Sequence, residues 1–388
     1  MDILGSIGGG AASLVFGYIV PFLVVLTVVV FVHEMGHFLV GRWCGVGVTA
    51  FSVGFGPEIA GFTDRRGTRW KLSAIPLGGY VKFVGDVNAA SVPDQDALQR
   101  MSPAERSVSF PHKTVAQRAA TVAAGPIANF LLAILVFAGL FYANGRHVLA
   151  PRVDAVQAGT AAERAGFKAD DVIVSINGRA IESFSDMQRI VSASAGDPLS
   201  IVVDRNGGAV TLEAVPDSRE QVTPFGTQRI GLLGLQASRN PDDVKHVTYG
   251  LLQSVRLGAW ETWYVVERTF GYLGKLVVGR ESVDQLSGPL RIAEVSGKVA
   301  SAGGMGALIS LVAVLSVSIG LINLFPIPLL DGGHLLFYAI EALRGRPLSE
   351  RAQEIGFRIG LAIVMMLMLF ATWNDIVHLS SSFTGRGT

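Results

Sequence analysis

Long apolar segments alternate along the chain with segments rich in polar residues. Four runs are apolar over a length close to the roughly 20 residues that a bilayer core requires. They cover residues 14–40, 119–142, 305–330 and 359–373. The fourth run is the shortest and becomes long enough if it begins near Ile355. We therefore predict a polytopic α-helical membrane protein with about four transmembrane helices.

The connection between the first two runs predicts a β-hairpin. Residues 46–62 and 70–84 are rich in glycine and β-forming residues, and a polar turn at residues 63–67 separates them. The hairpin is either membrane-associated, with an edge that accepts an extended peptide, or an ordinary cytoplasmic hairpin. Residues 88–113 are polar and contain prolines, which predicts a loop with a short helix.

A small α+β module is predicted between the second and third runs, over residues 151–216. Strands are expected at 152–156, 171–176, 199–204 and 209–215, and short helices at 160–165 and 185–194. Further on, Asn240-Pro241-Asp242 has the form of a helix start, and the helix should continue through Phe270. Its amphipathic, aromatic pattern fits a helix on the membrane surface or one packed on the protein.

These elements predict seven segments. They are a first transmembrane helix (1–44), a cytoplasmic or membrane-associated hairpin and loop (45–118), a second transmembrane helix (119–145), an α+β domain (146–236), an amphipathic helical linker (237–300), a third transmembrane helix (301–334), and a loop, fourth transmembrane helix and tail (335–388).

Composition and charge support the membrane class. Half of the 388 residues are apolar and 16% are charged, against about 25% charged in an average soluble protein. The net charge is +1, and the sequence has no cluster of basic residues typical of nucleic-acid binding. Lys and Arg are concentrated between the first two runs and between the last two, which predicts that these connections are cytoplasmic and that the α+β module lies outside.

The first run carries the strongest chemical signal, His33-Glu34-Met35-Gly36-His37. Residues four apart share one face of a helix, so both imidazoles can bind one metal ion while Glu34 holds a water on it. Burying these side chains in an apolar span is costly unless they are paired or bound to metal. We predict zinc binding by His33 and His37, with an unmetallated polar cluster as the alternative.

A catalytic zinc usually has three protein ligands and one open position. Asp331 is the best candidate for the third ligand, because it follows the third apolar run where Pro326 and Pro328 prevent regular helix. Paired glycines follow it and allow close backbone approach. The alternatives are that Asp331 is a helix N-cap at the membrane interface, or that His334 is a ligand or supports one.

Three motifs in this order resemble the site-2 protease family of intramembrane zinc metalloproteases, in particular its bacterial regulator-of-sigma-E type. HEMGH resembles the family's HExxH, residues 125–129 (GPIAN) resemble the glycine-rich motif of its second span, and residues 323–333 resemble its NxxPxPxLDG motif. Residues 76–82 (PLGGYVK) resemble the segment after its membrane-associated strands. The resemblance covers nearly the whole chain.

The resemblance implies that Asp331 completes a Zn²⁺ site with His33 and His37 and that Glu34 is the general base. It also implies that Asn323 holds the unwound substrate backbone and that Asn129 contributes nearby, although an amide in an apolar span also fits hydrogen bonding between helices. Residues 161–178 resemble part of a PDZ domain, a fold that accepts a peptide as an added strand.

The substrates implied by the resemblance are single-span membrane proteins, including an anti-sigma factor already trimmed on its outer side and leftover signal peptides. The implied location is the bacterial inner membrane, with the PDZ domain outside and the active site toward the cytoplasm. One rival is a non-catalytic membrane-anchored PDZ scaffold. An aspartyl protease would need a second intramembrane aspartate, and a zinc transporter would leave Glu34 and the outer module unexplained.

Overall fold

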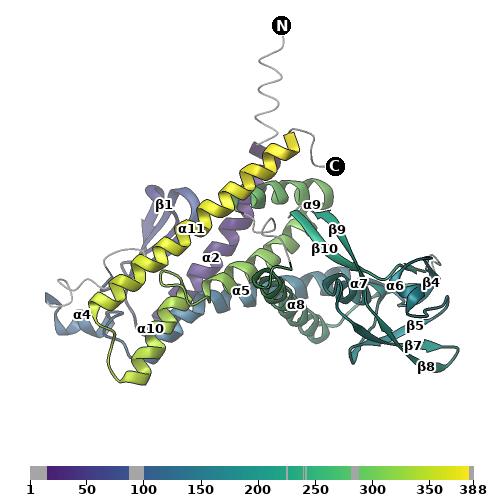
Figure 1. Ribbon diagram of the computed structural model, residues 1–388. Coiled ribbons are helices and arrows are strands. Elements are labelled where there is room, and N and C mark those ends of the chain that lie inside the picture. The colour runs from purple at the N-terminus through teal and green to yellow at the C-terminus, as the bar shows by residue number, and fades with distance from the viewer. Residues whose placement is uncertain are drawn as a thin grey trace, which may run out of the picture. The chain divides into compact units, whose positions relative to one another are not determined.

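The computed structural model describes residues 15–86, 100–223, 226–238, 240, 243–280 and 288–383. They fall into two compact units. The first comprises Met1–Ala138, Val255–Val266 and Ser287–Thr388, and the second comprises Gly139–Ser254 and Glu267–Leu286. Figure 1 labels the helices and strands of both units.

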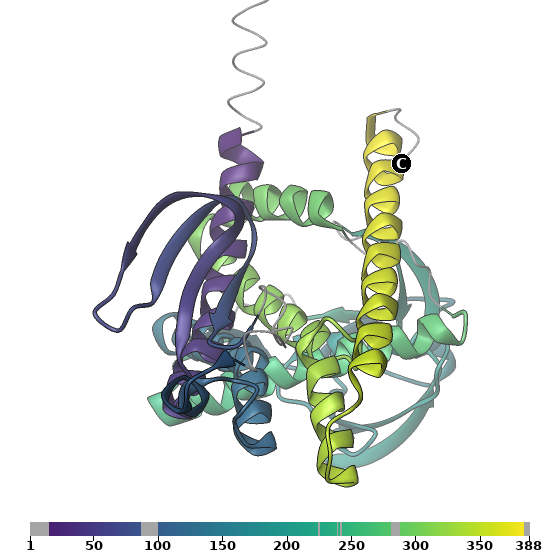
Figure 2. The ribbon, with the colours of Figure 1, turned by 90° about the vertical axis from the view of Figure 1, so that its left-hand side faces the viewer.

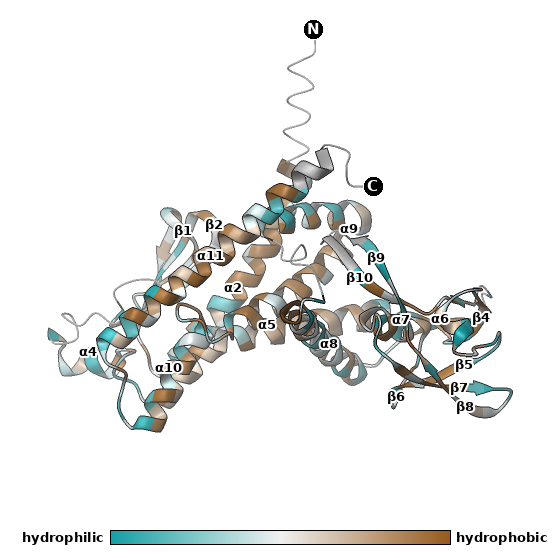
Figure 3. Ribbon diagram, in the orientation of Figure 1, coloured by the Kyte–Doolittle hydropathy of each residue, from teal (hydrophilic) through white to brown (hydrophobic). Residues whose placement is uncertain are grey.

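Among the described residues, four helices are long and apolar enough to cross a membrane, which agrees with the predicted number of spans. They are Val15–Trp43, made of the π-helical turn η1 (Val15–Ile19) and α2 (Val20–Trp43), then α5 (Val115–Asn144), α9 (Pro289–Asn323) and α11 (Glu350–Phe383). Apolar residues predominate along much of their length (Figure 3). Exposed side chains such as Leu135 and Leu369 suit contact with lipid.

The third span differs from its predicted bounds at both ends. α9 begins at Pro289 and carries a kink at Gly304, whose φ of 59° and ψ of −151° are not helical; Figure 2 shows the bend. The helix ends at Asn323 and not near residue 330. Pro326 and Pro328 explain the early end, because proline cannot donate to a helical hydrogen bond. α10 (Asp331–Arg344) follows this break.

The predicted hairpin is confirmed as β1 (Val48–Thr63) paired antiparallel with β2 (Arg69–Phe83). It lies alongside α2 (Figure 2). Its inner half is buried through Phe51, Val81 and Phe83, which pack in one cluster with Val122 of α5. The short helix predicted after it is α4 (Pro103–Val108), and residues 87–99 of the predicted loop lie outside the described residues.

The second unit contains a four-stranded antiparallel sheet in the order β6-β5-β7-β8. The second unit contains the strands and helices that the sequence predicts for the α+β module, and its apolar core includes Ile173, Ile201 and Val203. The elements are β3 (Arg146–Leu149), β4 (Val153–Val156), α6 (Ala161–Arg164), β5 (Val172–Ile176), β6 (Arg179–Ala180), α7 (Phe184–Ala193), β7 (Leu199–Arg205), β8 (Gly208–Ala214), β9 (Asp217–Thr223), β10 (Gly226–Leu232) and β11 (Leu235–Ala237).

The helix predicted to start at residues 240–242 starts later, so that prediction was wrong. Val244–Val247 form strand β12, which pairs with β3, and α8 runs over Leu251–Val277. Residues 244–247 form a strand because they pair with β3, which lies far away in the sequence. Local capping signals cannot predict pairing with a distant strand. Residues 241 and 242 themselves lie outside the described residues.

Candidate metal centre

The two histidines of α2 are buried on the face of that helix that packs against α5. His33 and His37 are each 8% exposed, and Gly36 lies between them in sequence. A Cβ on Gly36 would lie 2.3 Å from the carbonyl oxygen of Ala124 in α5. Glycine at this position therefore allows the two helices to approach closely enough to enclose the imidazoles.

A second glycine makes room for the imidazole nitrogens themselves. A Cβ on Gly125 of α5 would lie 2.2 Å from His37 Nε2 and 2.9 Å from His33 Nε2. These distances are far below van der Waals contact, so any side chain there would occupy the space beside both nitrogens. The glycine-rich motif of the second span thus borders the histidine pair directly.

Asp331 reaches the same place from the break after α9. Leu329 adopts a φ of 101° just before it, and α10 begins at Asp331. The following Gly332 and Gly333 pack on the backbone of the break, where a Cβ would meet carbonyl oxygens of Leu324 and Ile327 at 2.3 and 2.4 Å, respectively. This tight packing fixes the start of α10 and therefore the position of the carboxylate.

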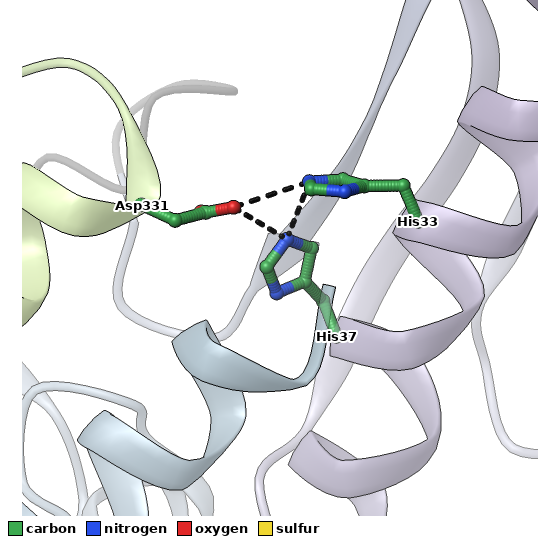
Figure 4. Close-up of side chains that lie close together, drawn as sticks. All are labelled: His33, His37 and Asp331. Atoms are coloured by element: carbon green, nitrogen blue, oxygen red, sulfur yellow. Dashed lines mark hydrogen bonds and ion pairs between the residues drawn. The ribbon is translucent and has the colours of Figure 1, made fainter. Parts of the chain in front are cut away.

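Three potential ligand atoms converge, as Figure 4 shows. Asp331 Oδ2 lies 3.1 Å from His33 Nε2 and 3.5 Å from His37 Nε2. The two Nε2 atoms are 3.2 Å apart. A tetrahedral zinc with bonds of about 2.0–2.2 Å separates its ligand atoms by roughly 3.3–3.6 Å, so this set fits a zinc ion.

The carboxylate also has capacity for a cation. Asp331 Oδ2 is buried and makes no hydrogen bond with the part of the chain that the structure describes. His334 does not belong to the group formed by the other three side chains; its ring packs near Tyr338 and Phe357. Three ligands leave one position of a tetrahedral zinc for water or substrate, which is the pattern of a catalytic site.

The other nitrogen of each imidazole faces α5. His37 Nδ1 donates to the carbonyl oxygen of Thr121 at 2.9 Å, and His33 Nδ1 lies 3.2 Å from the side-chain nitrogen of Asn129. Thr121 was not identified from the sequence. The available signal was the four-residue spacing of Thr121, Gly125 and Asn129, which places all three on one face of a helix.

Glu34 lies on a different face of α2, next to the hairpin. A Cβ on Gly79 of β2 would come within 3.0 Å of Glu34 Cγ and 2.9 Å of Val30 Cγ1. The Glu34 carboxylate also interacts with the backbone of Val81. Strand β2 therefore runs directly beside Glu34, and glycine permits the close contact.

The two asparagines predicted to contact substrate lie in different surroundings. Asn323 is partly exposed at the end of α9, and its side chain donates to the carbonyl oxygen of Ile319 at 3.0 Å. Asn129 is 0% exposed and packs between α2 and α9. A fully buried amide offers no surface to a substrate in this arrangement.

Comparison with known proteins shows the family of the chain. The sequence matches peptidase family M50, the site-2 protease family, over residues 21–367. The chain belongs to this family. It is 52% identical over 370 residues to a protein of Agrobacterium fabrum that is provisionally named a zinc metalloprotease, covering 95% of this chain and 98% of that protein.

A second relative supports the same assignment. The chain is 42% identical over 380 residues to metalloprotease MmpA of Caulobacter vibrioides, covering 92% of this chain and 95% of the relative. The protein is therefore a membrane-bound metalloprotease of family M50 with zinc as its metal. Among the described residues, the two buried histidines His33 and His37 and the partly buried Asp331 form a group that could hold the ion.

Proposed function

We propose that this M50 protease hydrolyses peptide bonds inside the transmembrane segments of single-span membrane proteins. The observation that carries the proposal is the depth of the ligand group along the first span. His33 and His37 precede Trp43, the last residue of that helix, by ten and six residues. At 1.5 Å of rise per residue this is about 9–15 Å, which lies within a hydrocarbon core of about 30 Å.

In this proposal His33, His37 and Asp331 hold the zinc, and Glu34 is the general base. Bound zinc would polarise the scissile carbonyl and lower the pKa of a water in the open position. Glu34 accepts a proton from the attacking water and delivers it to the leaving nitrogen. The Glu34 carboxylate interacts electrostatically with His37, His33 and Asp331, and β2 packs against its stem.

The substrate must be extended at the scissile bond, because a helical backbone hides its carbonyl groups. In the described structure β1 and β2 pair only with each other, and residues 50–53 of β1 are paired on both sides, with residues 69–72 and 79–82 of β2. The edges left without a partner strand among the described residues are residues 79–83 of β2 and 60–63 of β1. We propose that an extended substrate segment adds to one of these edges. Apolar side chains of the outer hairpin, including Ile59, Phe62 and Ile75, are exposed and suit an apolar peptide or lipid. Asn323 would bind a freed backbone group of the substrate.

The proposed location is a bacterial inner membrane with the metal centre toward the cytoplasm. The connection from α2 to α5 carries many Lys and Arg residues, and Arg344, Arg346, Arg351 and Arg358 lie in or beside the connection from α10 to α11, which favours a cytoplasmic position for both. The second unit, which we propose is a PDZ domain, would then lie outside. There it would restrict access to substrates already trimmed on their outer side, such as an anti-sigma factor.

The Glu34→Gln variant tests the chemistry. The neutral amide cannot accept the proton, so cleavage of a model transmembrane peptide should fall by at least about 100-fold, while the zinc content of the purified protein should stay near that of the parent. Full proteolysis by this variant would contradict the assigned base.

The restriction of substrates is tested separately by deleting residues 151–216, which should raise cleavage of untrimmed substrates relative to trimmed ones. Unchanged selectivity would count against it.

A further inference from the structure

One face of α5 supports both imidazoles from behind. Thr121, Gly125 and Asn129 are four residues apart, and together they lie along His37 and His33. The Nε2 atoms of both histidines point to Asp331, so their Nδ1 atoms are the ones available to α5. For His37 the acceptor is a main-chain carbonyl, which no substitution removes. For His33 the neighbour is a side chain, Asn129.

The direction of the Asn129 amide decides whether His33 can bind metal. If the amide NH₂ donates to Nδ1, the ring proton of a neutral His33 must sit on Nε2, the atom that faces Asp331. That tautomer has no lone pair on Nε2 for a metal. If the amide is turned by 180°, Oδ1 accepts the Nδ1 proton and the Nε2 lone pair is free. The two ends of an amide have almost the same size, so packing permits both.

The Asn129 amide must take the second orientation if His33 binds metal. Its side chain is 0% exposed, and with the NH₂ directed at His33 its Oδ1 has no hydrogen-bond partner among the described residues. An unpaired buried carbonyl costs about 1–3 kcal/mol. Turning the amide gives Oδ1 a donor from a metal-binding imidazole, and this type of bond is the usual partner of a zinc-ligating histidine.

We propose that Asn129 is a positioning residue of the metal centre, whose side-chain carbonyl accepts the Nδ1 proton of His33 and so fixes the tautomer and direction of that ligand. The proposal rests on the metal centre of the proposed function. It replaces the expected contact between Asn129 and the substrate with a contact to a metal ligand. Asn129 acts through His33 and does not touch the reacting atoms.

Asn129 also packs against α9. The hydroxyl of Ser316, a fully buried residue, donates to the main-chain carbonyl of Asn129 at 2.8 Å. A Cβ on Gly320 would lie 3.1 Å from Asn129 Cβ, so α9 packs tightly against this residue. The span that leads to Asp331 therefore also supports the partner of His33. Ser316 provides a matched control, because its hydroxyl contacts Asn129 but not the imidazole.

The test measures zinc affinity of the purified full-length protein in detergent by competition with a chromophoric chelator. Asn129→Leu keeps the approximate volume and removes the acceptor, so the affinity should fall by about 10- to 100-fold. Asn129→Asp keeps an acceptor oxygen and should bind zinc at least as tightly as the parent. Ser316→Ala should leave the affinity near that of the parent. Cobalt-substituted protein should show an altered visible spectrum for Asn129→Leu and not for Ser316→Ala.

Two results would overturn the proposal. Parental zinc affinity in Asn129→Leu would exclude a role for the acceptor, and equal weakening in Asn129→Leu and Asn129→Asp would show that only packing matters. If Asn129→Leu does not fold, Asn129→Ala replaces it in the comparison with Asn129→Asp. His33→Ala separates the two levels of the argument, because unchanged zinc binding in that variant would refute the metal centre itself.

Discussion

A single methyl group at Gly125 should disable the metal centre. The added Cβ would lie 2.2 Å from His37 Nε2 and 2.9 Å from His33 Nε2, whereas carbon atoms in contact normally lie about 3.5–4.0 Å from their neighbours. His37 cannot retreat easily, since its Nδ1 atom is hydrogen-bonded to the carbonyl oxygen of Thr121, one turn before Gly125 on the same helix. Overpacking of this kind costs about 1–3 kcal/mol. If that cost falls on the zinc-bound state, zinc affinity should drop by roughly 5- to 160-fold.

The assay compares zinc content, chelator competition and peptide cleavage for Gly125→Ala and a control on the same helix, Gly139→Ala. A Cβ on Gly139 meets nothing within 4 Å. The control should therefore keep its zinc, and it should gain slightly in helix stability because alanine favours helix by up to about 1 kcal/mol over glycine. If Gly125→Ala kept parental zinc affinity and activity, the close approach of α5 to the histidines would be refuted.

Two further predictions concern stability. Asp375 of α11 accepts hydrogen bonds from the backbone N–H groups of Gly288, Leu290 and Arg291 at the start of α9. Removing this cap in Asp375→Ala should lower the free energy of unfolding by about 0.5–2 kcal/mol. An unchanged thermal midpoint of the variant in detergent would show that no such cap forms. In the second unit burial raises the pKa of Asp171, but hydrogen bonds from Arg205 and from the N–H of Lys168 outweigh it and lower that pKa. The charged form thus stabilises the folded unit at pH values above the pKa of an unfolded aspartate, about 3.9, and this contribution is lost as the pH falls below it. At neutral pH, Asp171→Asn should weaken the protection of the β5 and β7 backbone amides against hydrogen exchange, and in this variant the protection should decline less steeply as the pH falls. A decline as steep as that of the parent would contradict the role of Asp171.

Local patterns were sufficient for the elements that bear the histidines. An apolar run of span length and a four-residue spacing fix a helix with His33 and His37 on one face, because the helical period is a property of the backbone alone. The hairpin likewise follows from β-forming residues around a polar turn. The bounds of α9 were less accessible, because its start at Pro289 is capped by Asp375, which lies far along the chain in α11.

The sequence by itself determined the spans, the hairpin and the kinds of side chain that could bind a metal. The tertiary structure alone decided which of them meet. Asp331 reaches the histidines because glycines let α2, α5 and the break after α9 approach closely, and the resulting distances of 3.1–3.5 Å follow from that packing. Thr121 and Asn129 become partners of the imidazoles for the same reason. Spacing along one helix is local, whereas separations between helices are set by side chains that lie far apart in the sequence.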